Sequence, residues 1–357
     1  MITTNSGKIL SKDARDWKFN HPSVLKKVND LFENVTDAVF VIFSNQLNLN
    51  SKVAERAAFE SKIDSVISKM GLANKCPVIC LFATSRDEFR KPCAGMWRIL
   101  KEEFIAKNSC EILIDESFFV GDAAGRQASW KPGRSADWSS VDHKFAVNVG
   151  LKFYTPEEFF LNEEPVKCYD LGRNPKSITV KLSVEQVTSP IVEEHFSGND
   201  SAIMVMAVGS PASGKSTFYR RHFEKRNFVH VNRDTLKTIP KCLSLVRSSL
   251  LNNQSVYIDN THPTRESREA FISVAKELNI PIKCLQFTAD EWLCKHLDVF
   301  RSITRKIEPL PAVAFNTFRA KYQPPTEGEG FDAIIQVPFD AYITTEDHLE
   351  LFHSYLF

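Results

Sequence analysis

The chain has 357 residues, of which 43% are hydrophobic and 25% are charged, and its 45 Lys and Arg residues nearly balance its 44 Asp and Glu residues. These fractions are typical of globular proteins and exclude intrinsic disorder and collagen-like repetition. Since a domain has about 100–200 residues, the length predicts two domains, each large enough to bury a core. The net charge of +1 argues at first against a polyanionic partner.

The longest apolar run, residues 202–208, is much shorter than the about 20 residues of a membrane-spanning helix, so we expect no membrane span. The first twenty residues contain no apolar stretch of the length found in signal peptides. No pair among the eight cysteines has CxxC spacing. This favours reduced, intracellular cysteines over a disulfide framework or a zinc site.

Up to about residue 161, the chain alternates between patterns typical of strands and of helices. Short apolar runs predict strands, and apolar residues at helical spacing predict helices between them. We expect strands at 38–43, 78–83, 118–120 and 145–147, and helices at 52–70 and 95–107. This alternation predicts an α/β domain over 1–161, with a parallel sheet covered on both faces.

Residues 162–200 interrupt the alternation with turn-forming clusters around one expected strand at 178–183, and we interpret them as a linker. The pattern then restarts and predicts a second α/β domain over 201–357. Its strands are expected at 202–208, 228–231, 256–258 and 282–287, and its helices from about 215, at 264–278 and at 290–303.

Residues 209–216, GSPASGKS, fit the phosphate-binding pattern GxxxxGK[ST] and lie between an expected strand and an expected helix. Lys215 would contact the β- and γ-phosphates of a nucleotide, and Ser216 would hold Mg²⁺. A Gly/Ser turn that happens to contain a lysine is disfavoured, because strand, motif and helix are in register. The expected nucleotide-binding residues are Gly209, Ser210, Ala212, Ser213, Gly214, Lys215, Ser216 and Thr217.

A phosphate loop indicates a nucleotide but not the reaction, and three further segments favour phosphoryl transfer. Arg233 and Asp234 follow a strand, where a carboxylate can accept a hydroxyl proton and a guanidinium can bind phosphate; a solvated ion pair or an Asp helix N-cap is the alternative. Asp259 ends the next strand, as a magnesium-binding acid of a nucleotide site would. Arg301 lies in a segment resembling a phosphate-binding lid, although spacing alone favours an ordinary basic helix end.

The second half resembles the kinase domain of the polynucleotide kinase 3'-phosphatase family, through GSPASGKSTF, FVHVNRDTL, VYIDNTHPTRESR and YQPPTEGEGFDAIIQVPF. The resemblance implies that Lys215 and Ser216 bind ATP and Mg²⁺. It implies that Asp234 is the general base that activates a DNA 5'-hydroxyl, with Arg233 binding a phosphate. Arg301 keeps the position of the family's lid arginine, although the residues before it, Leu297-Asp298-Val299, depart from the expected pattern.

The first half resembles that family's phosphatase domain, of the HAD superfamily, through ITTNSGK, VIFSNQ, FRKPCAGMW and FFVGDAAGRQASWKPG. The resemblance implies that Ser44, followed by Asn45, binds phosphate, that Lys91 is the motif lysine, and that Asp122 holds Mg²⁺. The family's DxDGT motif, which carries the nucleophile, would precede ITTNSGK, and the chain contains no DxD. The loop at 47–52 also lacks the family's Gly and Arg residues, and no phosphopeptide-binding FHA domain is present.

These departures predict a phosphatase domain that is inactive in this chain, without its first strand. Because that strand is central in the family's sheet, its two neighbours should have unpaired edges. We therefore expect an ATP-dependent polynucleotide 5'-hydroxyl kinase. The alternatives are a bifunctional enzyme whose motif was lost through start-site choice or splicing, a first domain that only binds DNA, and a small-metabolite kinase.

The resemblance also implies DNA with 5'-hydroxyl or 3'-phosphate ends as substrate and scaffold or ligase proteins of DNA repair as partners. It implies a monomer located in the nucleus. The charge distribution agrees with a polyanionic partner, because residues 211–250 contain nine Lys and Arg against two acidic residues. The whole-chain balance therefore hides a basic stretch next to the phosphate loop.

Overall fold

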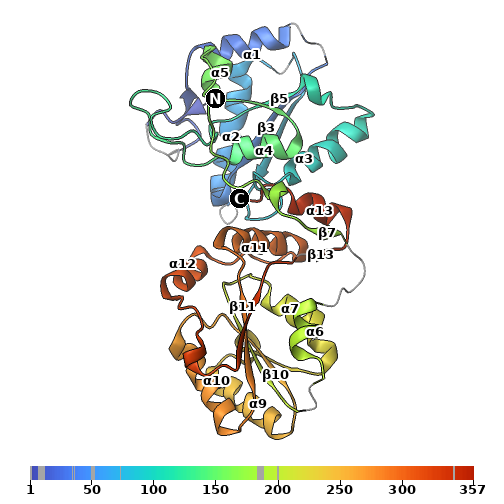
Figure 1. Ribbon diagram of the computed structural model, residues 1–357. Helices are drawn as coiled ribbons and strands as arrows, with labels where there is room; N and C mark the ends of the chain where they lie inside the picture. Colours follow the sequence, from blue (N-terminus) through green and yellow to red (C-terminus); the bar gives the residue numbers. More distant parts are fainter. Residues whose placement is uncertain are drawn as a thin grey trace. The chain divides into compact units, whose positions relative to one another are not determined.

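The structure is a computed structural model, and it describes residues 2–6, 13–33, 35, 37–49, 53–72, 74–182, 189–198, 201–340 and 342–357 (Figure 1). The chain divides into two compact units. Unit 1 contains Met1–Ile178 together with Phe352–Phe357, and unit 2 contains Thr179–Leu351. In the described part of the chain, no helix combines the length and the apolar composition that crossing a membrane requires.

The units differ from the predicted domain boundaries at two places. We expected a linker at 162–200, but residues 162–178 belong to unit 1. One contact that ties them there is the hydrogen bond from Asp170 N to Gly125 O, at 2.8 Å. The C-terminal segment Phe352–Phe357, which we expected in the second domain, also belongs to unit 1.

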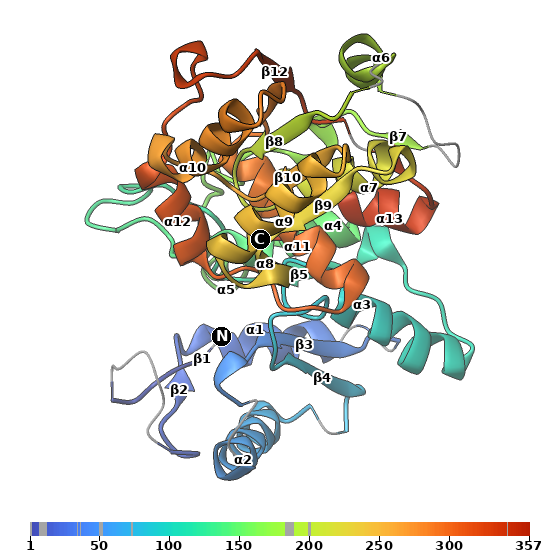
Figure 2. The same ribbon diagram turned by 90° about the horizontal axis from the view of Figure 1, so that it is seen from below.

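The strands described in unit 1 form three separate pairs (Figures 1 and 2). The pairs are β1 Ile2–Thr3 with β2 Lys18–Phe19, β3 Phe40–Asn45 with β4 Val78–Ala83, and β5 Phe118–Val120 with β6 Lys152–Tyr154. The first pair is antiparallel, and the other two are parallel. Among the described residues, β3 pairs only with β4 and β5 only with β6, so each of these four strands has one unpaired edge. The sequence predicts unpaired edges for the two neighbours of the missing strand.

Of the helices of unit 1, the one expected at 52–70 is observed as α2, whereas α1, α4 and α5 were not predicted. The expected helix at 95–107 is observed as a short α-helix that continues as a wider, π-helical segment, Leu100–Ile105. The α-helices are α1 Ser23–Glu33, α2 Val53–Met70, α3 Gly95–Ile99, α4 Val141–Val149 and α5 Pro156–Leu161.

The strand expected at 145–147 is wrong, because these residues lie in helix α4. Phe145 and Ala146 are adjacent in sequence and both fully buried, in the middle of this helix. Gly150, with a φ of 76°, ends the helix in the left-handed conformation. A short apolar run fits a helix or a strand equally well by pattern alone, and here the strand is β6 instead.

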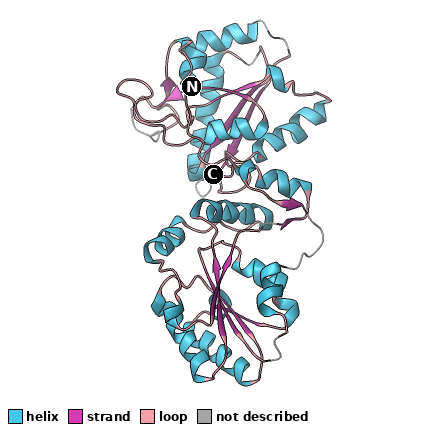
Figure 3. Ribbon diagram, viewed as in Figure 1, coloured by secondary structure: helices cyan, strands magenta, loops and turns pink. Residues whose placement is uncertain are grey.

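Unit 2 is built on a five-stranded parallel sheet with the order β12-β11-β8-β10-β9 (Figure 3). Its strands are β8 Met204–Val208, β9 Val229–Asn232, β10 Val256–Asp259, β11 Ile282–Phe287 and β12 Ala333–Val337. Alternate residues of β8 belong to two different buried clusters, one containing Met204 and Met206, the other Val205 and Ala207. The sheet therefore has a core on both faces, as predicted.

Helices lie on both sides of this sheet (Figures 1 and 3). The expected helices at 264–278 and 290–303 are confirmed as α10 and α11. The helices of unit 2 are α6 Pro190–Phe196, α7 Lys215–His222, α8 Arg233–Leu236, α9 Ile239–Leu251, α10 Arg265–Glu277, α11 Glu291–Arg305, α12 Ala312–Lys321 and α13 Glu346–Phe352, whose last residue belongs to unit 1. Part of the strand expected at 178–183 is β7 Lys181–Leu182, which pairs with β13 Tyr342–Ile343; residue 183 lies outside the described residues.

Candidate active site

The predicted phosphate loop connects the central strand β8 to helix α7. Ala212 and Gly214 adopt positive φ values of 59° and 100°, and Gly214 is the N-cap of α7. A Cβ atom added to Gly209 would lie 2.8 Å from Cβ of Phe287, so only glycine fits at the start of the loop. The loop thus lies at the carboxyl end of β8, between its neighbours β10 and β11. The chain reaches these two strands by connections in opposite directions, and ligands of such sheets usually bind where the connections diverge.

Lys215 is the residue around which the predicted site gathers. Its side chain is buried, and Nζ donates hydrogen bonds to Gly209 O at 3.0 Å, Ser210 O at 2.6 Å and Ser213 Oγ at 3.2 Å. In this state the lysine closes the loop on itself, and phosphate oxygens would replace these acceptors.

The pKa of Lys215 shows which charges surround it. Burial lowers this pKa to about 8, the negative charges of Asp259 and Asp234 raise it, and the positive charge of Arg301 lowers it. All three are residues that the sequence predicts for the site, and they come from β10, α8 and α11. The structure therefore brings Asp234, Asp259 and Arg301 within electrostatic reach of Lys215.

Asp259 ends β10 and is held by several hydrogen bonds. Its Oδ2 accepts from His230 Nε2 at 2.9 Å and from Asn232 Nδ2 at 3.1 Å, and its carboxylate also bonds the Ser216 side chain. Burial alone would raise the pKa of Asp259, but the bonds from His230 and Ser216 outweigh it and keep the pKa below its ordinary value. Asp259 is therefore a buried carboxylate.

His230 and Asn232 were missed in the sequence. They lie two positions apart on β9, so both side chains are on the same face of the strand. The His230 ring also stacks on Tyr219 of α7, with centroids 4.0 Å apart. The signal that could have found them is the polar spacing in Val229-His-Val-Asn232, which is unusual for a buried parallel strand.

The structure decides against one alternative for Asp234. Asn232, not Asp234, caps helix α8, because its Oδ1 accepts from Asp234 N at 2.7 Å. The Asp234 side chain is exposed, and Arg233 beside it is exposed as well. The carboxylate of Asp234 is thus not used as a helix cap.

Helix α11 runs beside the phosphate loop. The thiol of Cys294, fully buried, forms a hydrogen bond with the Ser210 side chain. Seven residues later, on the same side of the helix, Arg301 Nη2 donates to Asp298 Oδ1 at 2.5 Å. Arg301 therefore occupies a position from which a lid arginine can act, and it is paired with a carboxylate that the sequence did not single out.

One pair of oxygen ligands suits Mg²⁺. The Ser216 hydroxyl and the Asp259 carboxylate are hydrogen-bonded to each other beside Lys215, and Mg²⁺ is usually held by one or two such oxygens, water and phosphate. No cluster of three or more His, Cys, Asp or Glu side chains forms a metal site in the part of the chain that the structure describes. The donors present therefore fit a magnesium ion that is bound together with a nucleotide.

The residues predicted for unit 1 also come together in part. Lys91 is buried, and Nζ donates to Phe43 O at 2.9 Å and to Asp142 Oδ1 at 2.6 Å. Asn45 accepts from Lys91 N at 2.9 Å and donates to Lys91 O at 3.0 Å. Asp142 was missed, although a buried lysine requires a carboxylate partner.

Two other residues predicted for unit 1, Ser44 and Asp122, are not among the hydrogen-bond partners of Lys91 described above. The Ser44 hydroxyl accepts a hydrogen bond from Gln46 Nε2 at 2.8 Å. The Asp122 side chain is exposed, and its role in holding Mg²⁺ stays a prediction.

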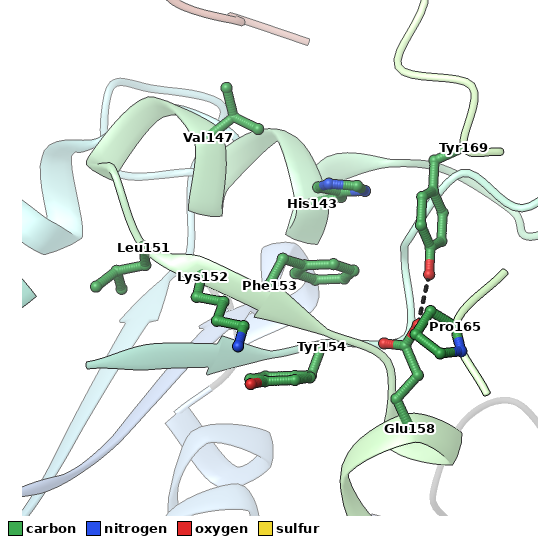
Figure 4. Close-up of a pocket in the computed structure, with 9 residues that line it drawn as sticks. All are labelled: His143, Val147, Leu151, Lys152, Phe153, Tyr154, Glu158, Pro165 and Tyr169. Carbon is green, nitrogen blue, oxygen red and sulfur yellow. Dashed lines mark hydrogen bonds between the residues drawn. The ribbon is translucent and has the colours of Figure 1, made fainter. Parts of the chain in front are cut away.

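A cavity of about 300 Å³ lies elsewhere in unit 1 (Figure 4). His143 and Phe153 stack within it, with centroids 4.3 Å apart, and Tyr169 donates through its hydroxyl to Glu158 at 2.8 Å. No residue predicted for a site lines this cavity. We therefore place the candidate site of unit 1 at Lys91 and Asp142 instead.

A parallel sheet with a phosphate loop after its central strand and an acid at the end of the neighbouring strand defines unit 2 as a P-loop kinase-like domain. The family model described as "Polynucleotide kinase 3 phosphatase" matches residues 1–160, and that described as "AAA domain" matches residues 204–325.

The "Bifunctional polynucleotide phosphatase/kinase" of Schizosaccharomyces pombe is 38% identical over 97% of this chain and 79% of its own length. A "Putative bifunctional polynucleotide phosphatase/kinase" of Acanthamoeba polyphaga mimivirus is 32% identical over 93% of this chain and 82% of its length. The "Polynucleotide 3'-phosphatase ZDP" of Arabidopsis thaliana is 36% identical over 45% of this chain and 22% of its length. The chain belongs to the bifunctional polynucleotide phosphatase/kinase family, with a HAD-like unit followed by a P-loop unit.

Proposed function

We propose that the chain transfers the γ-phosphate of ATP to the 5'-hydroxyl end of DNA. The observation that carries the proposal is the phosphate loop after β8, in which the side chain of Lys215 is buried, with the buried carboxylate of Asp259 at the end of the neighbouring strand β10. Asp234 and Arg301 lie within electrostatic reach of Lys215. A general base, a metal-binding acid and two cations around one phosphate position are what phosphoryl transfer requires.

Each residue has a defined part in this reaction. Asp234 accepts the proton of the attacking 5'-hydroxyl, whose oxygen bonds to the γ-phosphorus while the bond to the β-phosphate oxygen breaks and ADP leaves. Lys215 and Arg301 neutralise the charge on the phosphate oxygens. Ser216 and Asp259 would hold Mg²⁺, which supplies further positive charge to the phosphates.

The surface after the phosphate loop supports a nucleic-acid acceptor. Side chains that follow α7 and surround α8 are basic and exposed, and such charges bind phosphate backbones at a strength that falls with salt. Those next to the carboxyl end of β9 are Arg233, Lys237 and Lys241; Arg220 lies within α7, and Lys225 lies in the turn before β9. A small-metabolite kinase would not need them.

For unit 1, the proposal is that residues 1–357 do not hydrolyse 3'-phosphates by themselves. The Lys91–Asp142 pair is formed, but among the described residues β3 pairs only with β4 and β5 only with β6, and neither partner strand contains an Asp. Hydrolysis through a covalent intermediate needs such a nucleophile. A non-catalytic DNA-binding role is the second alternative for this unit, and a bifunctional enzyme with a nucleophile on a preceding segment is the first.

The test is an end-labelling assay with γ-labelled ATP and a 5'-hydroxyl oligonucleotide, run beside a 3'-phosphate oligonucleotide. We expect label transfer by the wild type and a fall in kcat of about 10²–10⁴-fold for Asp234→Asn, with unchanged ATP affinity. Glu224→Gln, an exposed acid of the same unit, serves as control. No transfer by the wild type, or full activity of Asp234→Asn, would refute the kinase proposal.

The same assay tests unit 1. Release of phosphate from the 3'-phosphate oligonucleotide would favour the bifunctional alternative over an inactive unit. If no phosphate is released from the 3' end, the DNA-binding role of unit 1 remains to be tested. Its test is to replace exposed lysines of unit 1 by uncharged residues and to measure the KM for DNA. From the role of the family alone, we extend the proposal to DNA repair in the nucleus, carried out by a monomer with scaffold or ligase partners. Imaging of the tagged chain would test the location, and capture of bound proteins would test the partners.

A further inference from the structure

Arg301 of helix α11 is anchored by Asp298, one turn earlier on the same helix. Asp298 Oδ1 accepts from Arg301 Nη2 at 2.5 Å, and Asp298 Oδ2 accepts from Leu310 N at 2.7 Å. The Asp298 side chain is 3% exposed, whereas that of Arg301 is 33% exposed. The buried carboxylate thus ties the guanidinium to the segment that follows α11, and the arginine still reaches the surface of the site.

The anchoring leaves one buried donor of Arg301 without a partner among the described residues. Nε of Arg301 is buried, and among the described residues it has no hydrogen-bond acceptor. A buried guanidinium N–H without an acceptor is destabilising, so this atom favours an acceptor supplied by a ligand. Arg301 lies seven residues after Cys294, on the same side of α11, and the Cys294 thiol contacts the Ser210 side chain of the phosphate loop, so the guanidinium is on the side of α11 that faces the loop.

We propose that Asp298 is a positioning residue that holds Nη2 of Arg301 and thereby directs Nε toward the γ-phosphate of the bound nucleotide. A guanidinium has donors in a rigid fork, so fixing one of them sets the direction of the others. The inference rests on the proposed function, because it assumes that the bound nucleotide is a phosphate donor. It needs only a nucleotide at the phosphate loop and does not depend on which molecule receives the phosphate.

The carboxylate is needed because two donors meet it. Arg301 Nη2 and Leu310 N each require an acceptor, and an ionised Asp offers two oxygens. In Asp298→Asn, the amide has one oxygen, and its NH₂ group would face one of the two donors. This substitution therefore removes the anchor with almost no change in volume.

The experiment compares the affinity for ADP with that for a non-hydrolysable ATP analogue, by calorimetry on the full chain. Asp298→Asn should weaken binding of the analogue about 10-fold, because the displaced Arg301 no longer contacts the γ-phosphate. Binding of ADP should be unchanged, because ADP has no γ-phosphate. Arg301→Gln should do the same, and the double variant should be no weaker than either single variant. Glu277→Gln, which opens the exposed Arg247–Glu277 pair, is the matched control and should change neither affinity.

Equal weakening of the affinities for ADP and for the analogue would overturn the proposal, because a purely structural role of Asp298 predicts it. A double variant whose loss of affinity is the product of the two single losses would overturn it as well, because the two residues would then act independently. If Asp298→Asn does not fold, Asp298→Glu decides: it keeps both acceptors but moves them by one methylene, and unchanged preference for the analogue would refute positioning. The readout needs no nucleic acid. A selective loss of affinity for the analogue, together with no labelling of DNA by the wild type, would therefore reject DNA as the phosphate acceptor and leave the role of Asp298 supported.

Discussion

Lys91 and Asp142, 51 positions apart, form an ion pair of 2.6 Å in which both side chains are less than 10% exposed. The pair joins the segment after β4 to the first turn of α4, at the ends of β3 and β5. A buried lysine also needs acceptors beyond its partner, and Phe43 O provides one at 2.9 Å. The unit thus has a buried charge pair at Lys91, the lysine that the resemblance predicts for the phosphatase motif.

Breaking this pair should destabilise unit 1 strongly. Asp142→Asn leaves the Lys91 charge buried without a counter-charge, and we expect the free energy of unfolding to fall by about 3–5 kcal/mol. Adding Lys91→Met should recover part of the loss. Urea unfolding followed by tryptophan fluorescence reports on this unit, because four of the five Trp residues lie in it. Glu33→Gln, in an exposed pair with Lys75, should cost less than about 1 kcal/mol; equal losses for both variants would contradict the prediction.

Gly209→Ala should weaken ATP binding. The added Cβ would lie 2.8 Å from Cβ and 3.2 Å from the backbone oxygen of Phe287, so the loop has to move away from the sheet. A displaced phosphate loop should lower affinity about 10- to 100-fold. Gly328→Ala is the control, since no atom lies within 4 Å of its added Cβ. Calorimetry with ATP measures both, and equal affinities would show that the loop tolerates the methyl group.

His262 should make unit 2 less stable in acid. Its ring is 3% exposed, and burial lowers its pKa to about 4, whereas in the unfolded chain it titrates near 6.5. The unfolded state therefore binds a proton that the folded state does not, and stability is lost as the pH falls from about 6.5 toward 4, by about 3 kcal/mol. His262→Asn, which tolerates the φ of 45°, should flatten this pH dependence.

The measurement for His262 is the free energy of unfolding between pH 7 and the acid limit of folding. His222, whose pKa burial also lowers to about 4, adds an effect of the same sign and should remain in the variant. His21→Asn, an exposed position, is the control. An unchanged acid slope in His262→Asn would contradict the prediction.

The C-terminal segment Phe352–Phe357 should protect Cys93. Tyr355 exchanges two hydrogen bonds of 2.8 Å with the Asn148 side chain, which also donates to Pro92 O at 2.8 Å. The Cys93 thiol donates to Leu356 O, and burial raises its pKa to about 12. In the full chain we expect Cys93 to resist alkylation at about pH 8, because thiolates are the reactive form.

Deleting residues 354–357 should expose Cys93 and make it react. Peptide mass spectrometry after alkylation measures this, and Cys110 and Cys168, both exposed, are the internal positive controls in each sample. Continued protection of Cys93 in the shortened chain would show that the segment is not its cover.

Several elements could be predicted because their signals are local. The position of the phosphate loop between a strand and a helix could be predicted, because strand, glycines, Lys215 and helix follow one another in the chain. The strand at 145–147 was wrong for the opposite reason. Three apolar residues fit the period of a strand and that of a helix, and only the structure shows that residues 145–147 belong to a helix of nine residues, Val141–Val149.

The missed residues share a different cause. His230 reaches Asp259 because β9 and β10 pair in a register that places Asn232 opposite Asp259. Asp142 meets Lys91, and Asp298 meets Leu310, through contacts between separate elements. Such pairs depend on how elements pack, which the spacing of residues along the chain does not specify.

The sequence by itself determined the two-domain α/β organisation, the nucleotide loop and the likeness to a polynucleotide kinase and phosphatase, because these depend on residues that are neighbours in the chain. Only the tertiary structure decided which carboxylates meet which cations, that Asn232 and not Asp234 caps α8, and that Phe352–Phe357 belongs to unit 1. The physical reason is that local backbone preferences act over a few residues. Hydrogen bonds and buried ion pairs form only where folding brings distant side chains out of water together.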